Sequence, residues 1–223
     1  MTVLLVVAMF AIFLTIDYLR NRKRVAEPAS QIEDKVPAKV QLQPTYVSGF
    51  DVPANLSYHP GHTWALQESP TFVRVGLDDF AARLVGKCDS IVLPKRGQWI
   101  RQGQKLVTIL RDGEKAEMVS PIEGEVTRVN EELSKDPGIS LREPYKAGWL
   151  VAVNSPDART NFRNLLSGDV ARRWMAEAAS RLFAKLPAMA GAVAQDGGVA
   201  VADLTAEMPG QPWHEITHEF FLI

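Results

Sequence analysis

The stretch TILRDGEKAEMVSP, residues 108–121, decides which fold this sequence predicts. An apolar strand runs into Arg-Asp-Gly-Glu, and a second strand leads out to a Ser-Pro pair. Asp-Gly between two such strands is typical of a tight β-hairpin turn, because glycine accepts the positive φ that the turn requires. The sequence therefore predicts a β-hairpin with Gly113 at its tip and one lysine, Lys115, just past the turn.

Short β segments punctuated by glycine and proline surround this hairpin. Regular short strands with turn signals every 8 to 12 residues or so are typical of sandwiches and barrels. A brief helix is predicted between them, with an N-cap at Asp78 or Asp79 and an end at Gly86. The sequence has no phosphate-binding loop, dinucleotide fingerprint or nucleophile elbow. The predicted strands are 71–75, 90–93, 105–110, 115–119, 125–129 and 149–153.

The composition excludes several classes of function. Of the 223 residues, 46% are hydrophobic and 23% are charged, which is the balance of a globular protein. A net charge of −1 provides no overall field for nucleic acid, so no nucleic-acid partner is predicted. Cys88 is the single cysteine, so an intrachain disulfide and a cysteine-based zinc or iron–sulfur site are both excluded.

The N-terminal segment predicts a membrane anchor. Residues 1–16 contain no charged side chain, and at about 1.5 Å per residue the 19 residues of the predicted helix span roughly 29 Å, close to the hydrocarbon thickness. A signal peptide, the alternative, carries its positive charges before the apolar run, whereas here they follow it at residues 20–24. Positive charges on the C-terminal side favour a cytoplasmic location for that side. We therefore predict a single-pass protein of the cell inner membrane with a cytoplasmic body.

A basic flank and a proline-rich linker, residues 20–57, follow the predicted transmembrane helix, residues 1–19. Four prolines between residues 28 and 53 favour extended chain and a simple tether. Near the end of this stretch, Phe50 and Val52 are apolar enough to pack onto the β-domain. The β-domain itself is predicted at residues 58–154, and a helical C-terminal extension at residues 155–223.

Five segments of the β-domain follow one another in a regular order: YHPGHTW (58–64), VGLDDFA (75–81), IVLPKRG (91–97), PIEGEVTRVNEEL (121–133) and EPYKAGWLVAV (143–153). Taken in this order, they resemble the H protein of the glycine cleavage system. Each is weak alone, but their order and spacing fit the family. The resemblance implies a mainly β barrel-sandwich hybrid of the lipoyl/biotinyl type. It also implies a hairpin lysine that carries lipoate and shuttles an aminomethyl group between partner enzymes.

The lysine that this resemblance implies is missing from its aligned position. Counting forward from Gly103 and back from Pro121 leads to the same residue, Gly113. Lys115 stands two residues later, where the side chain keeps the same face of the hairpin but leaves the tip. We therefore predict a domain without a cofactor. Lipoate attached to Lys115 is the alternative.

Three helices are predicted in the extension. Ser155-Pro156 is a typical helix start, which predicts a helix over residues 157–166. A second helix is predicted from a cap at Asp169 to residue 186, with an apolar stripe that repeats every four residues. The last helix is predicted over residues 212–221. The stripe of the second helix comprises Val170, Trp174, Ala178, Leu182 and Leu186.

The last predicted helix contains HEITH, residues 214–218, the H-E-x-x-H pattern of zinc metalloproteases. His214 and His218 share one helical face, and Glu215 would be the base. Such sites also need a third protein ligand, and five residues remain after His218. We therefore interpret the motif as the polar side of an amphipathic helix. His62, in GHTW, is likewise predicted to be structural rather than a ligand.

These observations predict a protein that is not an enzyme. The favoured hypothesis is a membrane-anchored H-protein-like domain that acts as a scaffold or adaptor for protein partners. A lipoyl carrier of the glycine cleavage type, modified at Lys115, is the nearest alternative, and a zinc hydrolase is the more distant one. Export-pump adaptors use the same hybrid fold but usually carry long helical hairpins, which the sequence does not predict.

Overall fold

The computed structural model describes residues 45–185, 200–205 and 212–222, together with Met9 and Thr15. Residues from Gln41 onward belong to one compact unit and residues 1–40 to another. Apart from Met9 and Thr15, the predicted transmembrane segment and the linker up to residue 44 lie outside the described residues. Within the described part, no helix is both long and apolar enough to cross a membrane.

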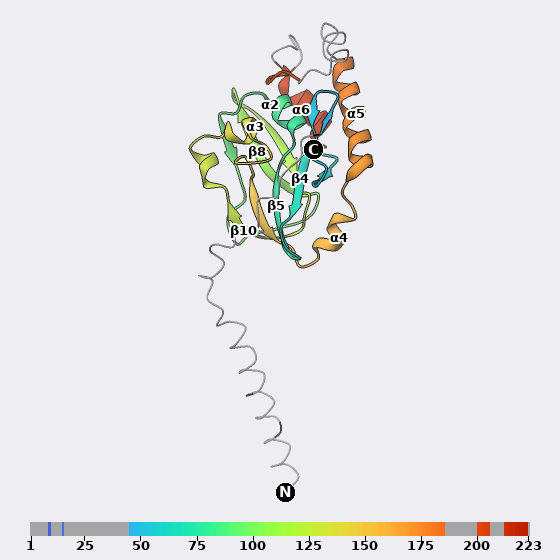
Figure 1. The fold of residues 1–223 in the computed structure, drawn as a ribbon. Coiled ribbons are helices and arrows are strands. Elements are labelled where there is room, and N and C mark those ends of the chain that lie inside the picture. The colour runs from blue at the N-terminus through green and yellow to red at the C-terminus, as the bar shows by residue number, and fades with distance from the viewer. Residues whose placement is uncertain (1–8, 10–14, 16–44, 186–199, 206–211, 223) are drawn as a thin grey trace. The chain divides into compact units, whose positions relative to one another are not determined.

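The described strands form three antiparallel sheets (Figure 1). The largest has the strand order β3-β4-β5-β11-β10-β7, the second has the order β6-β8-β9, and β1 pairs with β2. The strands are β1 (Tyr46–Val47), β2 (Phe50–Asp51), β3 (Ser57–His59), β4 (Thr63–Gln67), β5 (Phe72–Leu77), β6 (Ser90–Val92), β7 (Trp99–Ile100), β8 (Lys105–Arg111), β9 (Glu114–Val119), β10 (Gly124–Val129) and β11 (Val151–Asn154). Each strand predicted from the sequence is present, with ends shifted by one or two residues.

The two larger sheets share one hydrophobic core. Strand β5 buries Val73 and Val75, and strand β9 buries Met118, and all three belong to the same cluster of buried side chains. A hydrogen bond joins the sheets directly, because the Thr63 hydroxyl on β4 donates to the Val119 carbonyl on β9 at 2.9 Å. This sheet-rich arrangement agrees with the barrel-sandwich fold that the resemblance implied.

Helix α2 (Asp79–Val85) begins and ends where the sequence predicted. The Asp78 side chain accepts a hydrogen bond from the Ala81 N–H at 2.8 Å, which is the bond of an N-cap. Gly86 ends the helix with a φ of 67°, a conformation that glycine adopts without strain. A 3-10 turn, η1 (Glu131–Ser134), and the short helix α3 (Ile139–Arg142) precede strand β11.

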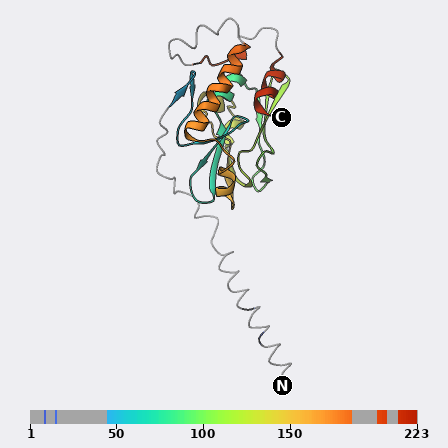
Figure 2. The same cartoon turned by 90° about the vertical axis from the view of Figure 1, so that its right-hand side faces the viewer.

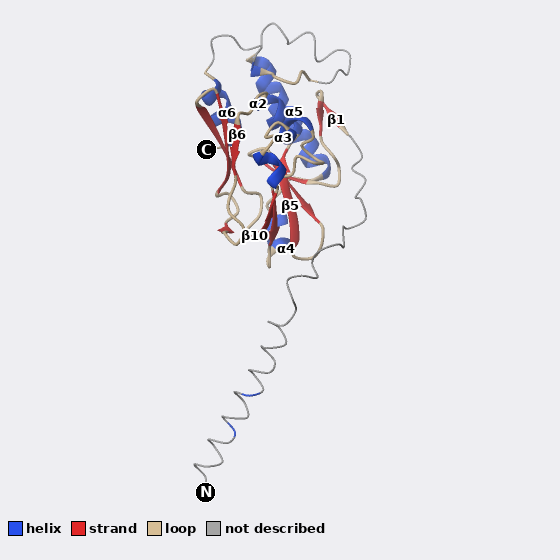
Figure 3. Cartoon of the chain, turned by 90° about the vertical axis from the view of Figure 1, so that its left-hand side faces the viewer, coloured by secondary structure: helices blue, strands red, loops and turns tan. Residues whose placement is uncertain are grey.

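Among the described residues, three further helices follow strand β11: α4 (Ala158–Phe162), α5 (Gly168–Ala184) and α6 (Trp213–Phe221). Figure 2 shows α5 in orange across the domain and α6 in red beside the green hairpin. The opposite view places α6 next to the three-stranded sheet (Figure 3). Helix α6 packs against β9, and α5 packs against β1 and β3. Side chains of both helices lie in the same core as the strands.

The predicted helix start at Ser155 is wrong. Ser155 directly follows strand β11, and its N–H donates to the Thr71 carbonyl at 2.7 Å. The helix begins three residues later, at Ala158, with Asp157 in the N-cap position and no side-chain capping bond. The Ser155 hydroxyl is buried, and no partner for it lies among the described residues.

The predicted stripe of α5 is partly wrong. Val170 is 49% exposed and Trp174 is half-buried, whereas the neighbouring positions Ala171 and Met175 are fully buried. Ala178 and Leu182 are buried as predicted. The N-cap position is Ser167, and Asp169 forms an ion pair with Arg172 within the first turn. Residues spaced by four lie on nearly the same side of a helix, so Val170 and Ala171 each begin a stripe with the predicted spacing. The packing of α5 decides which of the two stripes is buried.

Candidate functional site

The hairpin of β8 and β9 has the two-residue turn that the sequence predicted. Arg111 pairs with Glu114, which leaves Asp112 and Gly113 as the turn. Their φ angles are 51° and 82°, the positive values of a type I′ turn. No atom lies within 4 Å of the place where a Cβ on Gly113 would stand. Backbone conformation, not crowding, is therefore what favours glycine at the tip.

Lys115 lies in strand β9, opposite Leu110 and behind the turn. Its side chain is 71% exposed, and its Nζ lies 3.8 Å from a carboxylate oxygen of Glu117 on the same strand. Glu117 also accepts from Lys105 across the strand pair at 3.3 Å. Lys115 thus belongs to the solvated outer face of the hairpin, while Gly113 occupies the tip.

Arg111, the last residue of β8, ties the base of this turn to two distant parts of the chain. Its guanidinium donates to the Val85 carbonyl at 2.6 Å and to the Thr205 hydroxyl at 2.7 Å. A third bond, 3.1 Å long, reaches the Asp203 carboxylate. The guanidinium carbon lies 6.0 Å from the ring centroid of Trp213, a cation–π distance. The sequence analysis missed Arg111, because residues far apart in sequence supply its partners.

The last helix holds the other strand of the hairpin. His214 Nδ1 lies 3.0 Å from a Glu114 carboxylate oxygen, at the first residue of β9. Helix α6 buries Ile216, Phe220 and Phe221 in the core. We call Arg111 and its partners, together with the His214–Glu114 pair, the C-terminal clamp. The clamp holds both strands of the hairpin next to the turn.

The C-terminal clamp includes His214, the first residue of the HEITH motif. His214 is engaged with Glu114, and His218 and Glu215 are exposed on the outer side of α6. In the described ranges, no three His, Cys, Asp or Glu side chains gather as metal ligands would. The side chains of His214, Glu215 and His218 thus lie on the polar side of an amphipathic helix, while Ile216 and Phe220 lie in the core.

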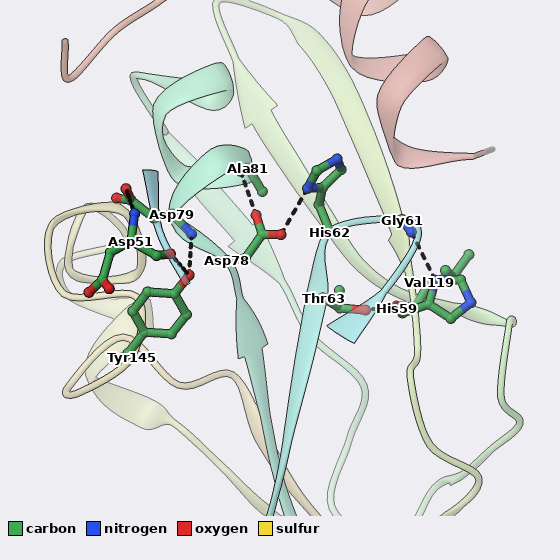
Figure 4. A network of polar contacts seen from close by, with 10 residues as sticks. All are labelled: Asp51, His59, Gly61, His62, Thr63, Asp78, Asp79, Ala81, Val119 and Tyr145. Atoms are coloured by element: carbon green, nitrogen blue, oxygen red, sulfur yellow. Dashed lines mark hydrogen bonds and ion pairs between the residues drawn. The ribbon is translucent and has the colours of Figure 1, made fainter. Parts of the chain in front are cut away.

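His62 lies in a buried polar network (Figure 4). Its Nδ1 lies 2.8 Å from an Asp78 carboxylate oxygen, and both side chains are almost fully buried. The imidazole stacks on Phe80 at 4.1 Å between ring centroids and lies 4.6 Å from the Trp174 ring. Because Asp78 also caps α2, His62 fastens the start of that helix to the turn before β4. This is the structural role that the sequence predicted.

The same network fastens β2 to α2 (Figure 4). The Tyr145 hydroxyl donates to the Asp51 carbonyl at 2.6 Å and accepts from the Asp79 N–H at 2.9 Å. The Asp79 carboxylate accepts from the Asp51 N–H and from Arg83, each at 2.9 Å. Burial raises the pKa of the Tyr145 hydroxyl well above its usual value, so it remains a donor. These bonds join β2, α2 and the segment before β11 in one polar network.

Taken together, the fold and hairpin define a domain of the barrel-sandwich type used by carrier proteins. The family model described as Glycine cleavage H-protein matches residues 56–178, more than half of the chain. The chain belongs to the glycine cleavage H-protein family. That family consists of lipoyl carriers rather than enzymes, so the prediction that the chain is not an enzyme agrees with its family.

Curated relatives match about half of the chain. A probable glycine cleavage system H protein 2 of Sulfurisphaera tokodaii is 32% identical over 130 residues, which cover 56% of this chain and 86% of the relative. The H protein of Kocuria rhizophila is 36% identical over 112 residues, which cover 48% of this chain and 87% of the relative. A crystal structure of the H protein from Mycobacterium marinum is 23% identical, with a TM-score of 0.47, over 57% of this chain and 98% of that one.

Proposed function

We propose that this protein is an H-protein-like domain without a lipoyl arm, anchored in the cell inner membrane and acting in the cytoplasm as a scaffold for protein partners. The observation that carries the proposal is the left-handed Gly113 at the tip of the hairpin. This residue stands at the position that the family resemblance assigns to the lipoyl lysine. Without an amine there, lipoate has no attachment point at the tip.

The C-terminal clamp supports the same proposal. A swinging arm needs a tip that projects freely toward the enzymes that modify and use it. Here Arg111 and Glu114, the residues on either side of the turn, are held by Asp203 and His214 respectively. A rigid hairpin and an exposed sheet face suit a binding surface, since binding residues are typically held by a rigid scaffold.

A second candidate is a lipoyl carrier modified at Lys115. Its support is the exposure of that side chain, 71%, which leaves the amine open to solvent. Lipoate carriage is also the ordinary role of the family. The setting of Lys115 within β9, opposite Leu110, counts against it, because the amine leaves the strand beside the turn rather than from the tip.

Intact mass spectrometry of the full chain, expressed in cells that lipoylate their own H protein, separates the two candidates. We expect the unmodified mass for the wild-type chain and for Lys115→Arg. Gly113→Lys is the matched positive control, since it restores an amine at the tip at a backbone cost of roughly 1–2 kcal/mol. A lipoyl increment on the wild-type chain that disappears in Lys115→Arg would establish the carrier candidate instead.

The scaffold and anchor components need their own measurements. A reporter fused after Ile223 tests the orientation, and a cytoplasmic signal is expected. Purification of the full chain from membranes in mild detergent should retain at least one stoichiometric protein partner. A chain that elutes alone at every detergent concentration, or a reporter that responds only outside the cytoplasm, contradicts the corresponding component.

A further inference from the structure

Two turns on either side of strand β7 share a sequence pattern and a set of contacts. Residues 95–98 read Lys-Arg-Gly-Gln and residues 101–104 read Arg-Gln-Gly-Gln. In each turn the glutamine side chain accepts a hydrogen bond from the N–H of the first, cationic residue, and the glutamine N–H donates back to the carbonyl of that residue. The side-chain bonds are Lys95 N to Gln98 Oε1 at 3.2 Å and Arg101 N to Gln104 Oε1 at 3.1 Å, and the return bonds measure 3.1 and 3.0 Å.

Both turns are also bonded to the neighbouring chain in the same way. The glycine N–H of each turn donates to a carbonyl of an adjacent segment, and an N–H of that segment donates to the glutamine carbonyl. The glycine bonds are Gly97 to Val126 at 2.7 Å and Gly103 to Ser120 at 2.8 Å, and the return bonds are Val126 to Gln98 at 2.9 Å and Ser120 to Gln104 at 2.7 Å. Each turn is therefore rigid at the backbone, and we call the pair the twin turns.

The twin turns hold an aromatic side chain between cations. Ile100 is buried in the core, which directs its neighbour Trp99 outward, where the indole residue is 51% exposed. Lys95, Arg96 and Arg101 are all exposed, and none of them forms an ion pair with another described residue. Strand β7 lies at the edge of its sheet. Lys95, Arg96, Trp99 and Arg101 therefore form a basic and aromatic surface on a rigid backbone. None of these four side chains belongs to the buried core.

The charge of this surface is locally one-sided along the chain. Residues 90–111 contain five lysines and arginines and no aspartate or glutamate. Two of the five, Lys105 and Arg111, pair with Glu117 and Asp203, which leaves Lys95, Arg96 and Arg101 to the surface. Two carboxylates lie nearby on the adjoining segment, Glu123 just before β10 and Glu125 opposite Trp99 in the strand pair. They offset part of the positive charge. A ligand of this surface is thus anionic, and its binding is moderate and sensitive to salt.

From these observations we infer that the twin turns, with Trp99 between them, form a docking surface for a bilayer that contains anionic lipid. Lysine and arginine near an anionic leaflet are attracted to its surface, and tryptophan favours the headgroup region. The inference rests on the proposed membrane anchor. A chain of residues 20–44 in the extended form that the sequence predicts reaches roughly 80 Å at about 3.1 Å per residue, and this length limits how far the domain can lie from the membrane.

Fluorescence of the full chain with vesicles of brominated lipid tests the contact. The Trp99 signal is taken as the difference between the wild-type chain and Trp99→Phe. We expect this signal to be quenched in vesicles with about 30% phosphatidylglycerol, not in pure phosphatidylcholine, and to recover in about 1 M salt, where the screening length is about 3 Å. An unquenched Trp99 in anionic vesicles overturns the inference.

Charge reversal provides the matched comparison. The variant K95E/R96E/R101E should lose the quenching of Trp99, whereas K135E/K146E/R173E, which changes the net charge equally at exposed positions elsewhere, should retain it. Equal loss in both variants means a general charge effect and overturns the inference. Loss of a co-purified protein partner in the first variant, with Trp99 unquenched in the wild-type chain, assigns the surface to an acidic protein instead.

The test separates the docking surface from the anchor. Flotation with neutral vesicles reports the anchor alone, and both triple variants should float like the wild-type chain. If the wild-type chain fails to float with neutral vesicles, the anchor is wrong. Docking is then read from flotation with anionic vesicles, which K95E/R96E/R101E must abolish for the inference to stand.

Discussion

Arg111 and Asp203 join the lipoyl-type hairpin to a segment 92 residues further along the chain. Their closest atoms, Arg111 Nη2 and Asp203 Oδ2, are 3.1 Å apart, and their side chains are only 15% and 25% exposed. Arg111 also bonds the end of α2 through the Val85 carbonyl. The pair therefore connects three parts of the fold at the base of one turn.

Replacement of Arg111 by methionine should destabilise the protein. The substitution keeps most of the side-chain volume but removes the bonds to Val85, Asp203 and Thr205. Loss of charge-assisted bonds at a half-buried site costs about 2–3 kcal/mol. Urea unfolding of the full chain in mild detergent, followed by tryptophan fluorescence, measures the change. Lys115→Met, on the exposed face of the same hairpin, is the control and should change the free energy of unfolding by less than about 0.5 kcal/mol.

Gly86 lies next to the Asp203 carboxylate, and this contact leads to a second prediction. A Cβ at this position would overlap the Asp203 side chain, and the φ of 67° disfavours any other residue. Gly86→Ala should therefore cost more than Gly113→Ala, which has a positive φ but open space around it. We expect about 1–2 kcal/mol for Gly113→Ala from the backbone alone and at least about 1 kcal/mol more for Gly86→Ala.

A double-mutant cycle checks the cause of that difference. If Gly86→Ala acts by pushing Asp203 away from Arg111, its cost should shrink in the Arg111→Met background. If the free-energy costs of Gly86→Ala and Arg111→Met simply add, the clash does not act through the Arg111–Asp203 pair. Equal costs for Gly86→Ala and Gly113→Ala would show that φ alone determines the loss of stability.

The sequence predicts those parts of this molecule whose cause is local. Asp112-Gly113 defines its own turn, Asp78 and Gly86 mark the ends of α2, and the apolar face of α6 repeats with the helical period. The resemblance to the H protein then supplied the arrangement of the strands. No local sequence pattern predicts the C-terminal clamp. An arginine after a predicted strand looks like any solvated residue until Asp203 and Trp213 are placed beside it.

Two local signals misled for a physical reason. Ser155-Pro156 has the chemistry of a helix start, but the Ser155 hydroxyl accepts no bond from the described residues, and α4 begins at Ala158. The first two positions of the α5 stripe were one residue early, because Ala171 and Met175, rather than Val170 and Trp174, are buried when α5 packs against β1 and β3. Tertiary contacts overrode a correct local preference in both places.

The single cysteine should react slowly. Burial, followed by the nearby Asp89 carboxylate, raises the pKa of the Cys88 thiol from 9.0 to about 11. Near pH 8 the thiolate fraction is then roughly 100-fold below that of an unperturbed thiol, and thiolate is the reactive form. Iodoacetamide labelling followed by mass should be about 100-fold slower for the folded chain than for the chain in urea. Equal rates would mean that Cys88 is open to solvent.

The stability of the fold should decrease in mild acid because of His59. Burial, followed by the neighbouring His62, lowers the pKa of His59 below 6.5, and its Nδ1 accepts a hydrogen bond from the Gly61 N–H at 3.0 Å, which requires the unprotonated nitrogen. The unfolded chain therefore binds a proton at a higher pH than the folded chain does. The stabilising contribution is complete above the unfolded pKa and decreases as the pH falls through 6.5 toward the folded value.

The variant His59→Asn tests this prediction, because it keeps an acceptor for the Gly61 N–H but does not titrate. Its free energy of unfolding, measured in urea from about pH 5 to pH 8, should vary less with pH than that of the wild-type chain. A variant with the same slope as the wild-type chain would assign the acid sensitivity to other groups.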